Sequence, residues 1–309
     1  MNILLTGATG FIGSRIINLL EFSKLTVLGR SLPEGFMGAF YEAEIGPDVD
    51  YSASLRDIDV VIHSAARAHV MDDKAESPLS AYRDVNVDGT LTLAKQAAAA
   101  GVKRFIFISS IKVNGESTLF DSAYKYDDSS SPEDAYGVSK MEAETGLLKL
   151  SKSTGMEVVI IRPPLVYGPG VKANFALMMN LARKNLPLPL GAIKNKRSLV
   201  GIDNLVDLII TCIDHPNAAN QTFLVSDDND VSTTDLLKEL TLAAGKKPRL
   251  IPIPMPIIKF FATLLGKKSI SDRLCGSLQV DITHTKETLG WVPPVSFQEG
   301  IARCFTKDK

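Results

Sequence analysis

The chain has 309 residues, of which 45% are hydrophobic and 22% charged, and its formal net charge is −1. This length and a mean hydropathy of +0.09 suit a soluble globular protein with one large core or two linked cores. The balanced charge excludes a broad basic face, so nucleic acid is not an expected partner and phosphate binding depends on local Lys or Arg residues.

The cysteines lie far apart and show no paired spacing, which favours a reducing compartment over a disulfide framework. We interpret Cys212, Cys275 and Cys304 as small buried hydrophobes. The opening apolar run is only a few residues long and lacks the basic start and cleavage pattern of a signal peptide. The expected location is therefore the cytoplasm.

The first thirteen residues form a short apolar strand that leads into Gly7, Gly10 and Gly13. Glycines at such positions let the chain turn tightly, let backbone N–H groups approach a pyrophosphate, and let the following helix pack closely on the strand. The pattern predicts that this turn, with Phe11 and Ile12, binds a dinucleotide cofactor. Its spacing differs from G-x-G-x-x-G, so a turn without a ligand is the alternative.

Apolar strands alternate with helices through the first half of the chain. Strands are predicted at residues 2–5, 25–28, 60–63, 104–109 and 158–162, and helices at residues 13–21, 79–100 and 134–154, with Gly101 ending the second helix. The strands are nearly continuous apolar runs, as expected for parallel strands that helices cover on both faces. The pattern predicts an α/β fold with a Rossmann-like doubly wound parallel sheet.

Proline becomes frequent after residue 170, and the regular alternation weakens. About residues 198–226 still have the pattern of strand, helix and strand, so the chain is expected to return there to the first domain. The predicted dinucleotide-binding domain is therefore 1–170 plus about 198–226. A smaller C-terminal lobe is expected at about 171–197 and 227–309.

Two further segments are interpreted from their composition. Residues 121–134 are acidic and rich in serine, which predicts a solvated loop that ends at a helix N-terminus. Residues 251–265 are the most hydrophobic later stretch, but prolines and Lys259 interrupt it and it is too short to span a bilayer. A buried helix is the expected structure, and peripheral membrane contact is the alternative.

Three polar residues follow the fourth predicted strand and open the next helix. Tyr136 and Lys140 are four residues apart and share one helical face, while Ser110 precedes them at a strand end. An ammonium group and the positive ring of an oxidised nicotinamide favour phenolate, which lowers a phenol pKa of about 10. Such a tyrosine can exchange a proton with a substrate oxygen, to which Ser110 hydrogen-bonds, while hydride moves to or from the ring. An ordinary surface pair is the alternative.

At this point the chain resembles the extended short-chain dehydrogenase/reductase family, the NAD-dependent epimerases and dehydratases of nucleotide sugars. Beyond the glycines and the Tyr136/Lys140 pair, the resemblance rests on His63-Ser-Ala65-Ala66, Asn86-Val-Asp-Gly89-Thr90, Arg162-Pro-Pro-Leu-Val-Tyr167-Gly-Pro-Gly170 and Leu289-Gly290-Trp291-Val-Pro293, and it runs nearly end to end. It implies an enzyme in which Ser110, Tyr136 and Lys140 are catalytic, Ala65, Ala66 and Pro163 line the cofactor, and Lys140 also holds the nicotinamide ribose.

The resemblance also implies a UDP-sugar substrate, bound by the smaller lobe. Asn174, Arg197 and Arg273 stand where members contact the nucleotide diphosphate, and arginine suits bidentate phosphate binding. A solvated surface charge is the alternative for each. Lys112 stands where a small or acidic residue is common, so it either reshapes the sugar pocket or points to solvent.

The cofactor preference depends on the end of the second strand. NAD-preferring members usually offer an acid to the adenosine ribose there, whereas this chain has Arg30. A guanidinium can pair with a 2′-phosphate, so we expect NADP(H), with NAD(H) as the alternative.

The residues after the catalytic serine reduce the number of candidate reactions. The 4,6-dehydratases place an acidic pair there, and this chain has Ile111 and Lys112, so dehydration is not expected. Asn114 stands where members of the family often have a tyrosine before the following glycine. The remaining candidates act at C4. The strings around Ser110, Asn174 and Arg197 are most similar to reductases of UDP-4-keto-6-deoxy-N-acetylglucosamine in polysaccharide biosynthesis, with a UDP-glucose or UDP-N-acetylglucosamine 4-epimerase as the alternative.

A dinucleotide-sensing regulator on the same fold is a further alternative, against which the presence of both Tyr136 and Lys140 argues. The four histidines, at positions 63, 69, 215 and 284, show no metal-ligand spacing, so no metal is expected. The resemblance implies a homodimer that forms through residues 79–100 and 134–154.

Overall fold

A computed structural model describes residues 1–21, 24–67, 77–264, 266 and 268–306. Its main element is a sheet of seven parallel strands, and the strand order is β10-β7-β5-β4-β1-β2-β3. The strands are β1 (Ile3–Thr6), β2 (Leu25–Gly29), β3 (Ala39–Glu42), β4 (Val60–His63), β5 (Arg104–Ile108), β7 (Glu157–Arg162) and β10 (Thr222–Leu224). The doubly wound α/β fold expected from the sequence is therefore confirmed.

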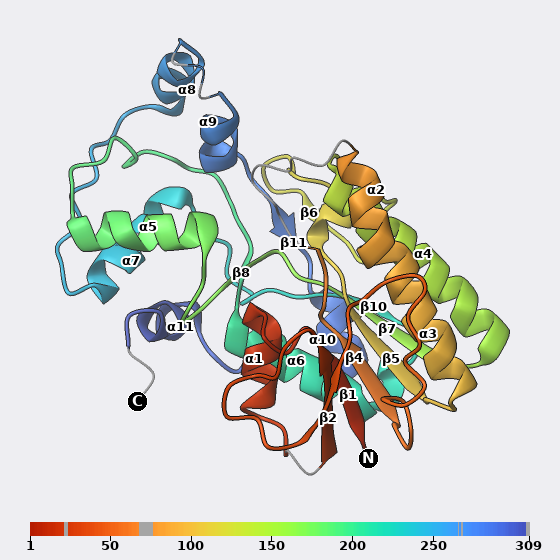
Figure 1. The fold of residues 1–309 in the computed structure, drawn as a ribbon. Helices are drawn as coiled ribbons and strands as arrows, with labels where there is room; N and C mark the ends of the chain where they lie inside the picture. Colours follow the sequence, from red (N-terminus) through yellow and green to blue (C-terminus); the bar gives the residue numbers. More distant parts are fainter. Residues whose placement is uncertain (22–23, 68–76, 265, 267, 307–309) are drawn as a thin grey trace.

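Helices cover both faces of this sheet (Figure 1). On one face lie α1 (Phe11–Ile17) and α6 (Ile202–Asp214), and on the other lie α2 (Pro78–Arg83), α3 (Thr90–Ala99) and α4 (Ala135–Thr154). Alternate residues of β1 explain why: Ile3 and Leu5 pack in the core under α1 and α6, whereas Leu4 packs in the core under α3 and α4. Both faces of the strand are apolar because both are buried.

The predicted helix at 79–100 is not uniform. A π-helical segment, η2 (Asp84–Gly89), joins α2 to α3, and it brings Asn86 and Thr90 under the sheet edge. Gly101 follows the last turn with a φ of +85°, as expected for a glycine that ends a helix. Single π-helical turns such as η2 occur often at functional sites.

The remaining elements lie outside the main sheet. They are η3 (Ile111–Val113), β6 (Ala123–Tyr124), β8 (Leu165–Tyr167), α5 (Ala173–Lys184), β9 (Leu199–Gly201), η4 (Pro216–Ala218), α7 (Thr233–Ala243), α8 (Met255–Leu264), α9 (Lys268–Cys275), β11 (Gln279–Val280), α10 (Thr283–Leu289) and α11 (Phe297–Arg303). A separate apolar core joins α5, α7 and α11 through Phe175, Leu240 and Ile301. The strand–helix–strand expected near 198–226 is present, and β10 joins the main sheet beside β7.

Several local expectations are corrected by the structure. Strand β3 was not expected, because its residues are mostly exposed at the sheet edge and lack an apolar run. Helix α1 ends at Ile17, four residues before the predicted end. The expected solvated loop at 121–134 contains β6, which pairs with β11 of the C-terminal lobe. The predicted end of that loop is confirmed, because Asp134 caps α4 by accepting a hydrogen bond from Gly137 N at 2.7 Å.

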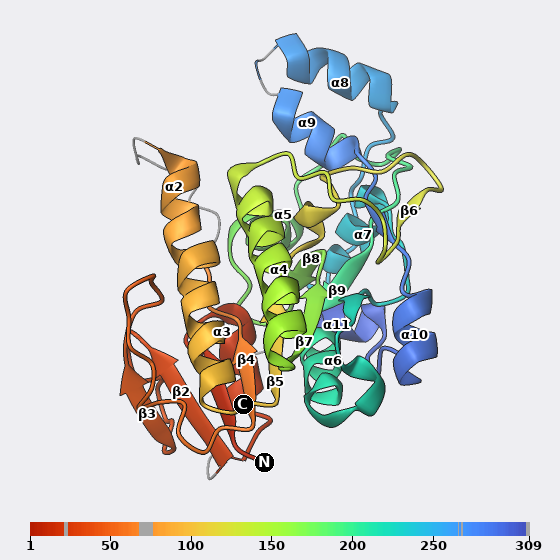
Figure 2. The ribbon, with the colours of Figure 1, turned by 90° about the vertical axis from the view of Figure 1, so that its right-hand side faces the viewer.

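The expected burial of the apolar segment 251–265 is wrong. It forms α8, none of whose residues is buried, and Figures 1 and 2 show α8 at the end of the molecule farthest from the main sheet, next to α9. Helix α8 packs against α9 on one side, and its residues on the other side are exposed. No helix within the described ranges has the length and apolarity needed to cross a membrane. The three cysteines are buried as expected.

Candidate active site

The predicted site residues lie at the carboxyl edge of the main sheet. The chain reverses its strand order between β1 and β4, and ligands of open α/β sheets bind at such a reversal. Gly7, Ala65, Ser110 and Pro163 follow strands β1, β4, β5 and β7 within two residues at this edge. Parallel strands bring these sequence-distant segments together because their carboxyl ends share one edge.

The glycine turn has no room for side chains. Gly7 adopts a φ of +73°, and a Cβ atom there would lie 2.6 Å from Ala65 N. A Cβ atom on Gly13 would lie 2.2 Å from Gly7 O, so α1 can pack this closely on β1 only with glycine. Phe11 and Ile12 form the half-buried start of α1. The turn therefore offers the bare backbone that a pyrophosphate needs, and it fits a dinucleotide cofactor.

The loop after β4 is held against this turn by Thr6. The hydroxyl of Thr6 accepts a hydrogen bond from Ala65 N at 3.2 Å, and Ser64 Oγ donates to Thr6 O at 2.7 Å. Ala65 and Ala66 are half-buried. On the other side of β4, the Pro163 carbonyl accepts a hydrogen bond from Ile111 N at 3.0 Å, which joins the end of β7 to η3. These small residues bound the edge where we expect the cofactor.

Tyr136 and Lys140 share one face of α4 as the spacing predicted. The Lys140 ammonium donates a hydrogen bond to Ile108 O at 2.8 Å, and it lies 4.4 Å from the centre of the Phe107 ring and 5.9 Å from that of Tyr136. Its side chain is only 2% exposed. The end of β5 therefore fixes this lysine directly beside the tyrosine.

Burial governs the protonation of this pair. It lowers the pKa of the Lys140 ammonium to about 7, although the carboxylate of Glu144 opposes the change. Burial and the charge of Asp134 raise the pKa of the Tyr136 phenol above 10. The protein's own groups thus keep Tyr136 protonated, contrary to the lowered pKa expected from Lys140. That expectation depends on the added positive charge of an oxidised nicotinamide.

Ser110 caps η3, and η3 packs on the first turn of α4. Ser110 Oγ accepts a hydrogen bond from Lys112 N at 3.2 Å. A Cβ atom on Gly137 would lie 2.8 Å from Lys112 O, so the glycine lets α4 approach η3 closely. The segment carrying Ser110 and the turn carrying Tyr136 are therefore in direct contact.

The structure gives Lys112 carboxylate partners on both sides. Its ammonium donates to Glu116 at 2.7 Å and to Asp134, the N-cap of α4, at 2.5 Å. Burial opposes the charged form, but these two hydrogen bonds outweigh it and raise the pKa of Lys112. Lys112 thus holds the start of the helix that carries Tyr136, and its contact with a substrate stays a prediction.

The other predicted substrate residues lie in the smaller lobe. Arg197 donates to the carbonyls of Arg273 at 2.7 Å and Gly276 at 3.3 Å, so the structure brings Arg197 next to the end of α9. Burial lowers the pKa of the Arg197 guanidinium. Asn174 is exposed in the first turn of α5, and Arg30 is exposed just after β2, at the same sheet edge as Gly7. In the described part of the chain, neither Asn174 nor Arg30 is hydrogen-bonded to the other site residues.

Comparison with known proteins identifies the family. The model of the NAD dependent epimerase/dehydratase family matches residues 3–226. A UDP-glucose 4-epimerase of Vibrio cholerae is 55% identical over 305 residues, which cover 97% of this chain and 93% of the relative. The chain belongs to the NAD-dependent epimerase/dehydratase family. It is therefore an enzyme family member rather than a sensor built on the same fold.

More distant relatives extend the likeness. An undecaprenyl-diphosphate-linked N-acetylglucosamine 4-epimerase of Escherichia coli O157:H7 is 28% identical, covering 98% of this chain and 93% of that protein. Among solved structures, a UDP-glucose 4-epimerase of Thermotoga maritima has a TM-score of 0.78 at 24% identity, covering 98% and 97% of the two chains. A UDP-glucuronic acid 4-epimerase of Bacillus cereus has the same TM-score at 22% identity and the same coverage. The two structures support the fold.

Sequence reasoning missed a buried polar network that supports the site of this epimerase/dehydratase family member. Arg162 donates to both oxygens of Glu144 and, at 2.9 Å, to Asn114 Oδ1, while Ser109 Oγ also donates to Glu144. All four side chains are buried. The only sequence signal was Asn114, which replaces a tyrosine and here supplies an acceptor to Arg162.

A second missed residue is His63, which is fully buried under the sheet edge. Its Nδ1 lies 2.8 Å from Thr6 Oγ1 and its Nε2 lies 2.9 Å from Thr90 Oγ1. Burial and the nearby Lys140 lower its pKa to about 3. The neutral ring therefore links β1, β4 and α3 beneath the predicted cofactor site. His69 lies outside the described residues, and the expectation of no metal stays a prediction.

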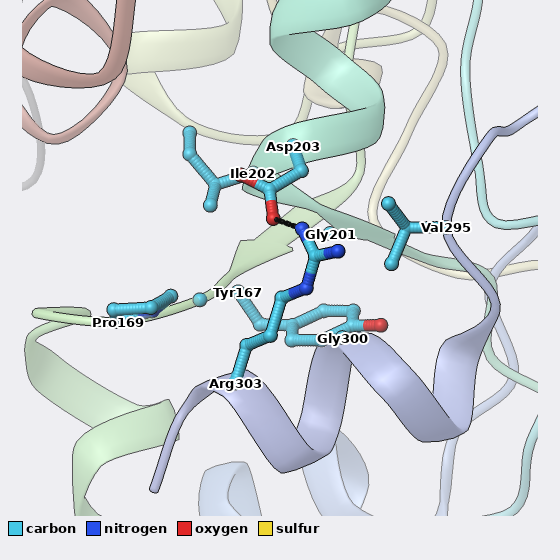
Figure 3. Close-up of a pocket in the computed structure, with 9 residues that line it drawn as sticks. Tyr167, Pro169, Gly201, Ile202, Asp203, Val295, Gly300 and Arg303 are labelled. Atoms are coloured by element: carbon cyan, nitrogen blue, oxygen red, sulfur yellow. Dashed lines mark hydrogen bonds and ion pairs between the residues drawn. The ribbon is translucent and has the colours of Figure 1, made fainter. Parts of the chain in front are cut away.

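Two cavities of the structure lie away from Tyr136. One of about 10 Å³ is closed by Arg303 of α11, which reaches Asp203 at the start of α6 beside the Tyr167 ring (Figure 3). The other, about 370 Å³, opens between residues 191–196 and the start of α7, with Phe120 and Asp230 at its border. The small cavity admits about one water, and neither cavity is lined by Ser110, Tyr136 or Lys140.

Proposed function

We propose that this protein is an NAD(P)-dependent UDP-sugar 4-epimerase, which interconverts UDP-sugars that differ in configuration at C4. The observation that carries the proposal is 55% identity, over nearly the whole chain, to the UDP-glucose 4-epimerase of Vibrio cholerae. The position of Ser110, Tyr136 and Lys140 at the same edge of the sheet as the glycine turn supports it, because a C4 alcohol needs a proton acceptor next to a hydride acceptor.

In this proposal the chain's own residues bind, orient and move one proton. When bound, NAD supplies the hydride acceptor and donor. The backbone around Gly7, Gly10 and Gly13 holds its pyrophosphate, and Lys140 binds the ribose. Tyr136 takes the proton of the C4 hydroxyl and later returns it, while Ser110 hydrogen-bonds to the same oxygen. Ala65, Ala66 and Pro163 line the cofactor.

We further propose that the smaller lobe, about residues 171–197 and 227–309, binds the UDP-sugar, and that residues 1–170 with about 198–226 bind the cofactor. Arg197 is the main candidate for the diphosphate, because its partly desolvated guanidinium lies beside Arg273 at the border of the lobe. Asn174 is the candidate for a polar contact from α5. Substituting Arg197 by Met is expected to raise KM for the UDP-sugar at least tenfold and to change kcat less.

The reductase that the sequence strings favoured is not supported by the comparisons, which favour the epimerase alternative. The two reactions differ in cofactor use, since a reductase consumes one reduced cofactor per sugar and an epimerase returns its hydride.

Arg30 carries the finer proposal of an NADP(H) preference. Equal KM values for NAD(H) and NADP(H) would contradict that role of Arg30.

The experiment is a pair of assays on the purified enzyme. Incubation with UDP-glucose or UDP-N-acetylglucosamine, with NAD or NADP and without reduced cofactor, is expected to yield the C4 epimer with no net change in absorbance at the reduced-nicotinamide band. Incubation with UDP-4-keto-6-deoxy-N-acetylglucosamine and NADPH or NADH is the second assay. Oxidation of one cofactor per sugar, with no epimerisation in the first assay, would overturn the proposal in favour of the reductase.

The homodimer through residues 79–100 and 134–154 stays a prediction. Sedimentation equilibrium of the enzyme at micromolar concentration is expected to give twice the 33.4 kDa chain mass. A substitution of Glu142, which lies on α4 and pairs with Arg83 of α2, would then test whether this face is the interface.

A further inference from the structure

Lys112 lies where η3 meets the helix that carries Tyr136, and it belongs to a cluster of three charged residues. Its ammonium donates hydrogen bonds to Asp134 at 2.5 Å and to Glu116 at 2.7 Å. The side chain of Lys112 is 24% exposed, and those of Glu116 and Asp134 are 34% and 30% exposed. Charges that are partly shielded from water in this way interact more strongly than fully solvated pairs do. Lys112 is therefore a fixed cation and not a solvated surface charge.

The Asp134 carboxylate has a different partner on each oxygen. Its Oδ1 accepts the hydrogen bond from Gly137 N that caps α4, and its Oδ2 accepts the hydrogen bond from Lys112. Tyr136 follows Asp134 by two residues and lies in the same first turn. The negative charge of Asp134 adds to burial in raising the pKa of the Tyr136 phenol. The group that orders this turn thus also opposes loss of the tyrosine proton.

We propose that Lys112 is a positioning residue for Tyr136, which holds the Asp134 cap in place and offsets its charge, so that the first turn of α4 is ordered without a net negative charge beside the phenol. Lys112 then acts on the chemistry through Asp134 and not through a contact with the sugar. The close packing of η3 on α4 supports this, because a Cβ atom on Gly137 would lie 2.8 Å from Lys112 O. The inference rests on the proposed acid–base role of Tyr136 and holds for either C4 reaction.

Other polar and charged groups also face Tyr136. The Lys140 ammonium of α4 lies 5.9 Å from the centre of the Tyr136 ring, and the Tyr82 ring of α2 packs edge-on against it at 6.1 Å. The Arg67 guanidinium lies 5.6 Å from the centre of the Tyr82 ring. Substitutions at Lys112 or its carboxylate partner leave all of these groups in the chain. A difference between such variants in the ionisation of Tyr136 therefore reports the contact between η3 and the helix cap.

The test combines two pH titrations of the enzyme with oxidised cofactor bound. One is the pH dependence of kcat, and the other is the tyrosinate absorbance of each protein minus that of its Tyr136→Phe counterpart. Lys112→Met is expected to move the ionisation of Tyr136 to higher pH by about 0.5–1 unit, because the carboxylate charge is then unopposed. The rise of kcat with pH is expected to move in the same direction, since the base form of Tyr136 appears later. Lys112→Arg is expected to titrate like the wild type.

Asp134→Asn tests the same contact from the other side. It keeps a capping side chain but removes the charge, so the ionisation of Tyr136 is expected to move to lower pH. This opposite shift keeps the test valid if Lys112→Met is unstable. The double variant of Lys112→Met and Asp134→Asn is expected to return the ionisation to the wild-type pH or below it. The matched control is Lys103→Met, which breaks a lysine–carboxylate pair just before β5, at the opposite edge of the sheet, and is expected to change neither titration.

Three results would overturn the proposal. The first is a kcat of Lys112→Met that falls equally at every pH with an unshifted tyrosinate titration, which would mean a purely structural role. The second is a higher KM for the UDP-sugar with an unshifted titration, which would mean a contact with the substrate. The third is a double variant in which Tyr136 ionises at as high a pH as in Lys112→Met.

The absorbance titration does not depend on turnover, so it separates this proposal from the proposed function. The expected shifts without activity on any UDP-sugar would refute the C4 reaction and leave the role of Lys112 standing. Epimerisation with unshifted titrations would refute the role of Lys112 and leave the reaction standing.

Discussion

At the scale of single residues, Tyr136 and Lys140 of α4 lie in opposite electrostatic surroundings. Lys140 is fixed by Ile108 O and the Phe107 ring, and burial lowers its pKa to about 7. Tyr136 lies near the carboxylate of Asp134, which together with burial raises its pKa. Lys112 binds that carboxylate and so limits its effect. Proton exchange by Tyr136 thus depends on positive charge arriving with the cofactor.

Substitution of Tyr136 by Phe removes the phenolic oxygen and keeps the ring. We expect kcat to fall by about 10² to 10⁴, because general acid–base catalysis is lost. The affinity for NAD, measured by fluorescence titration, is expected to stay within about twofold, since the glycine turn and Lys140 are unchanged. Turnover equal to that of the wild type would contradict the proton-transfer role of Tyr136.

His63 predicts a specific pH dependence of stability. The unfolded chain binds its proton below about pH 6.5, whereas the folded chain binds it only near pH 3. Protonation therefore favours the unfolded state between these values. The contribution of His63 is complete above pH 6.5 and is lost as the pH falls, by up to about 1.4 kcal/mol per pH unit.

The measurement is urea unfolding of the wild type and His63→Gln at several pH values between 4.5 and 7. The variant is expected to lose less stability on acidification than the wild type, because the amide binds no proton. Carboxylates contribute equally to both proteins, so the difference isolates His63. Parallel stability curves for the two proteins would disprove this assignment.

At the scale of elements, the pair of Arg162 and Glu144 joins β7 to α4, and Asn114 and Ser109 extend this link to η3 and the end of β5. The pair is buried, with side-chain exposures of 8% and 4%. Its members satisfy one another, so the cost of burying two charges is offset only while both are present. The network positions Lys140 because Glu144 follows it by one helical turn.

Substitution of Arg162 by Met is expected to lower the free energy of unfolding by about 3–5 kcal/mol, since it leaves the Glu144 carboxylate buried without its cation. The double variant with Glu144→Gln is expected to recover part of this loss. Guanidinium unfolding measures both. The control is Lys103→Met, which breaks the exposed pair with Asp59 and is expected to change stability little. Equal losses for Arg162→Met and Lys103→Met would contradict the prediction.

At the scale of the whole molecule, the C-terminal segment closes the smaller lobe. Phe297 and Ile301 of α11 are almost fully buried, and Phe297 packs edge-on against Tyr167 at 5.9 Å between ring centres. Arg303 of α11 and Arg15 of α1 both bind Asp203 at the start of α6. Helix α11 is thus linked to α1 through Asp203, and it packs through Phe297 and Ile301 in the core of the lobe that we expect to bind substrate.

Substitution of Phe297 by Ala is expected to lower the free energy of unfolding by about 3–5 kcal/mol, because it removes a buried ring from a packed core. Phe260→Ala on α8 is the control, since its ring is 61% exposed and is expected to change the stability by less than about 0.5 kcal/mol. The comparison uses guanidinium unfolding of both proteins. A larger loss for Phe260→Ala would show that α8 is packed in solution.

The features that the sequence predicted well are local in the chain. Three glycines after a strand define a turn, four residues between Tyr136 and Lys140 place both on one helix face, and continuous apolar runs define buried parallel strands. Each of these patterns depends on neighbours within a few residues, so the fold and the family followed without coordinates. Strand β3 was missed because an exposed edge strand carries no such pattern.

Contacts between residues that are far apart in the chain could be identified only from the tertiary structure. The sequence could not show that Lys112 binds Asp134, that Asn114 accepts from Arg162, or that His63 links Thr6 and Thr90, because each contact joins elements whose separation depends on packing. The apolar segment of α8 shows the same limit. Its composition is that of a buried helix, and its exposure follows from a tertiary arrangement in which, among the described residues, no element covers the face that carries Phe260 and Phe261.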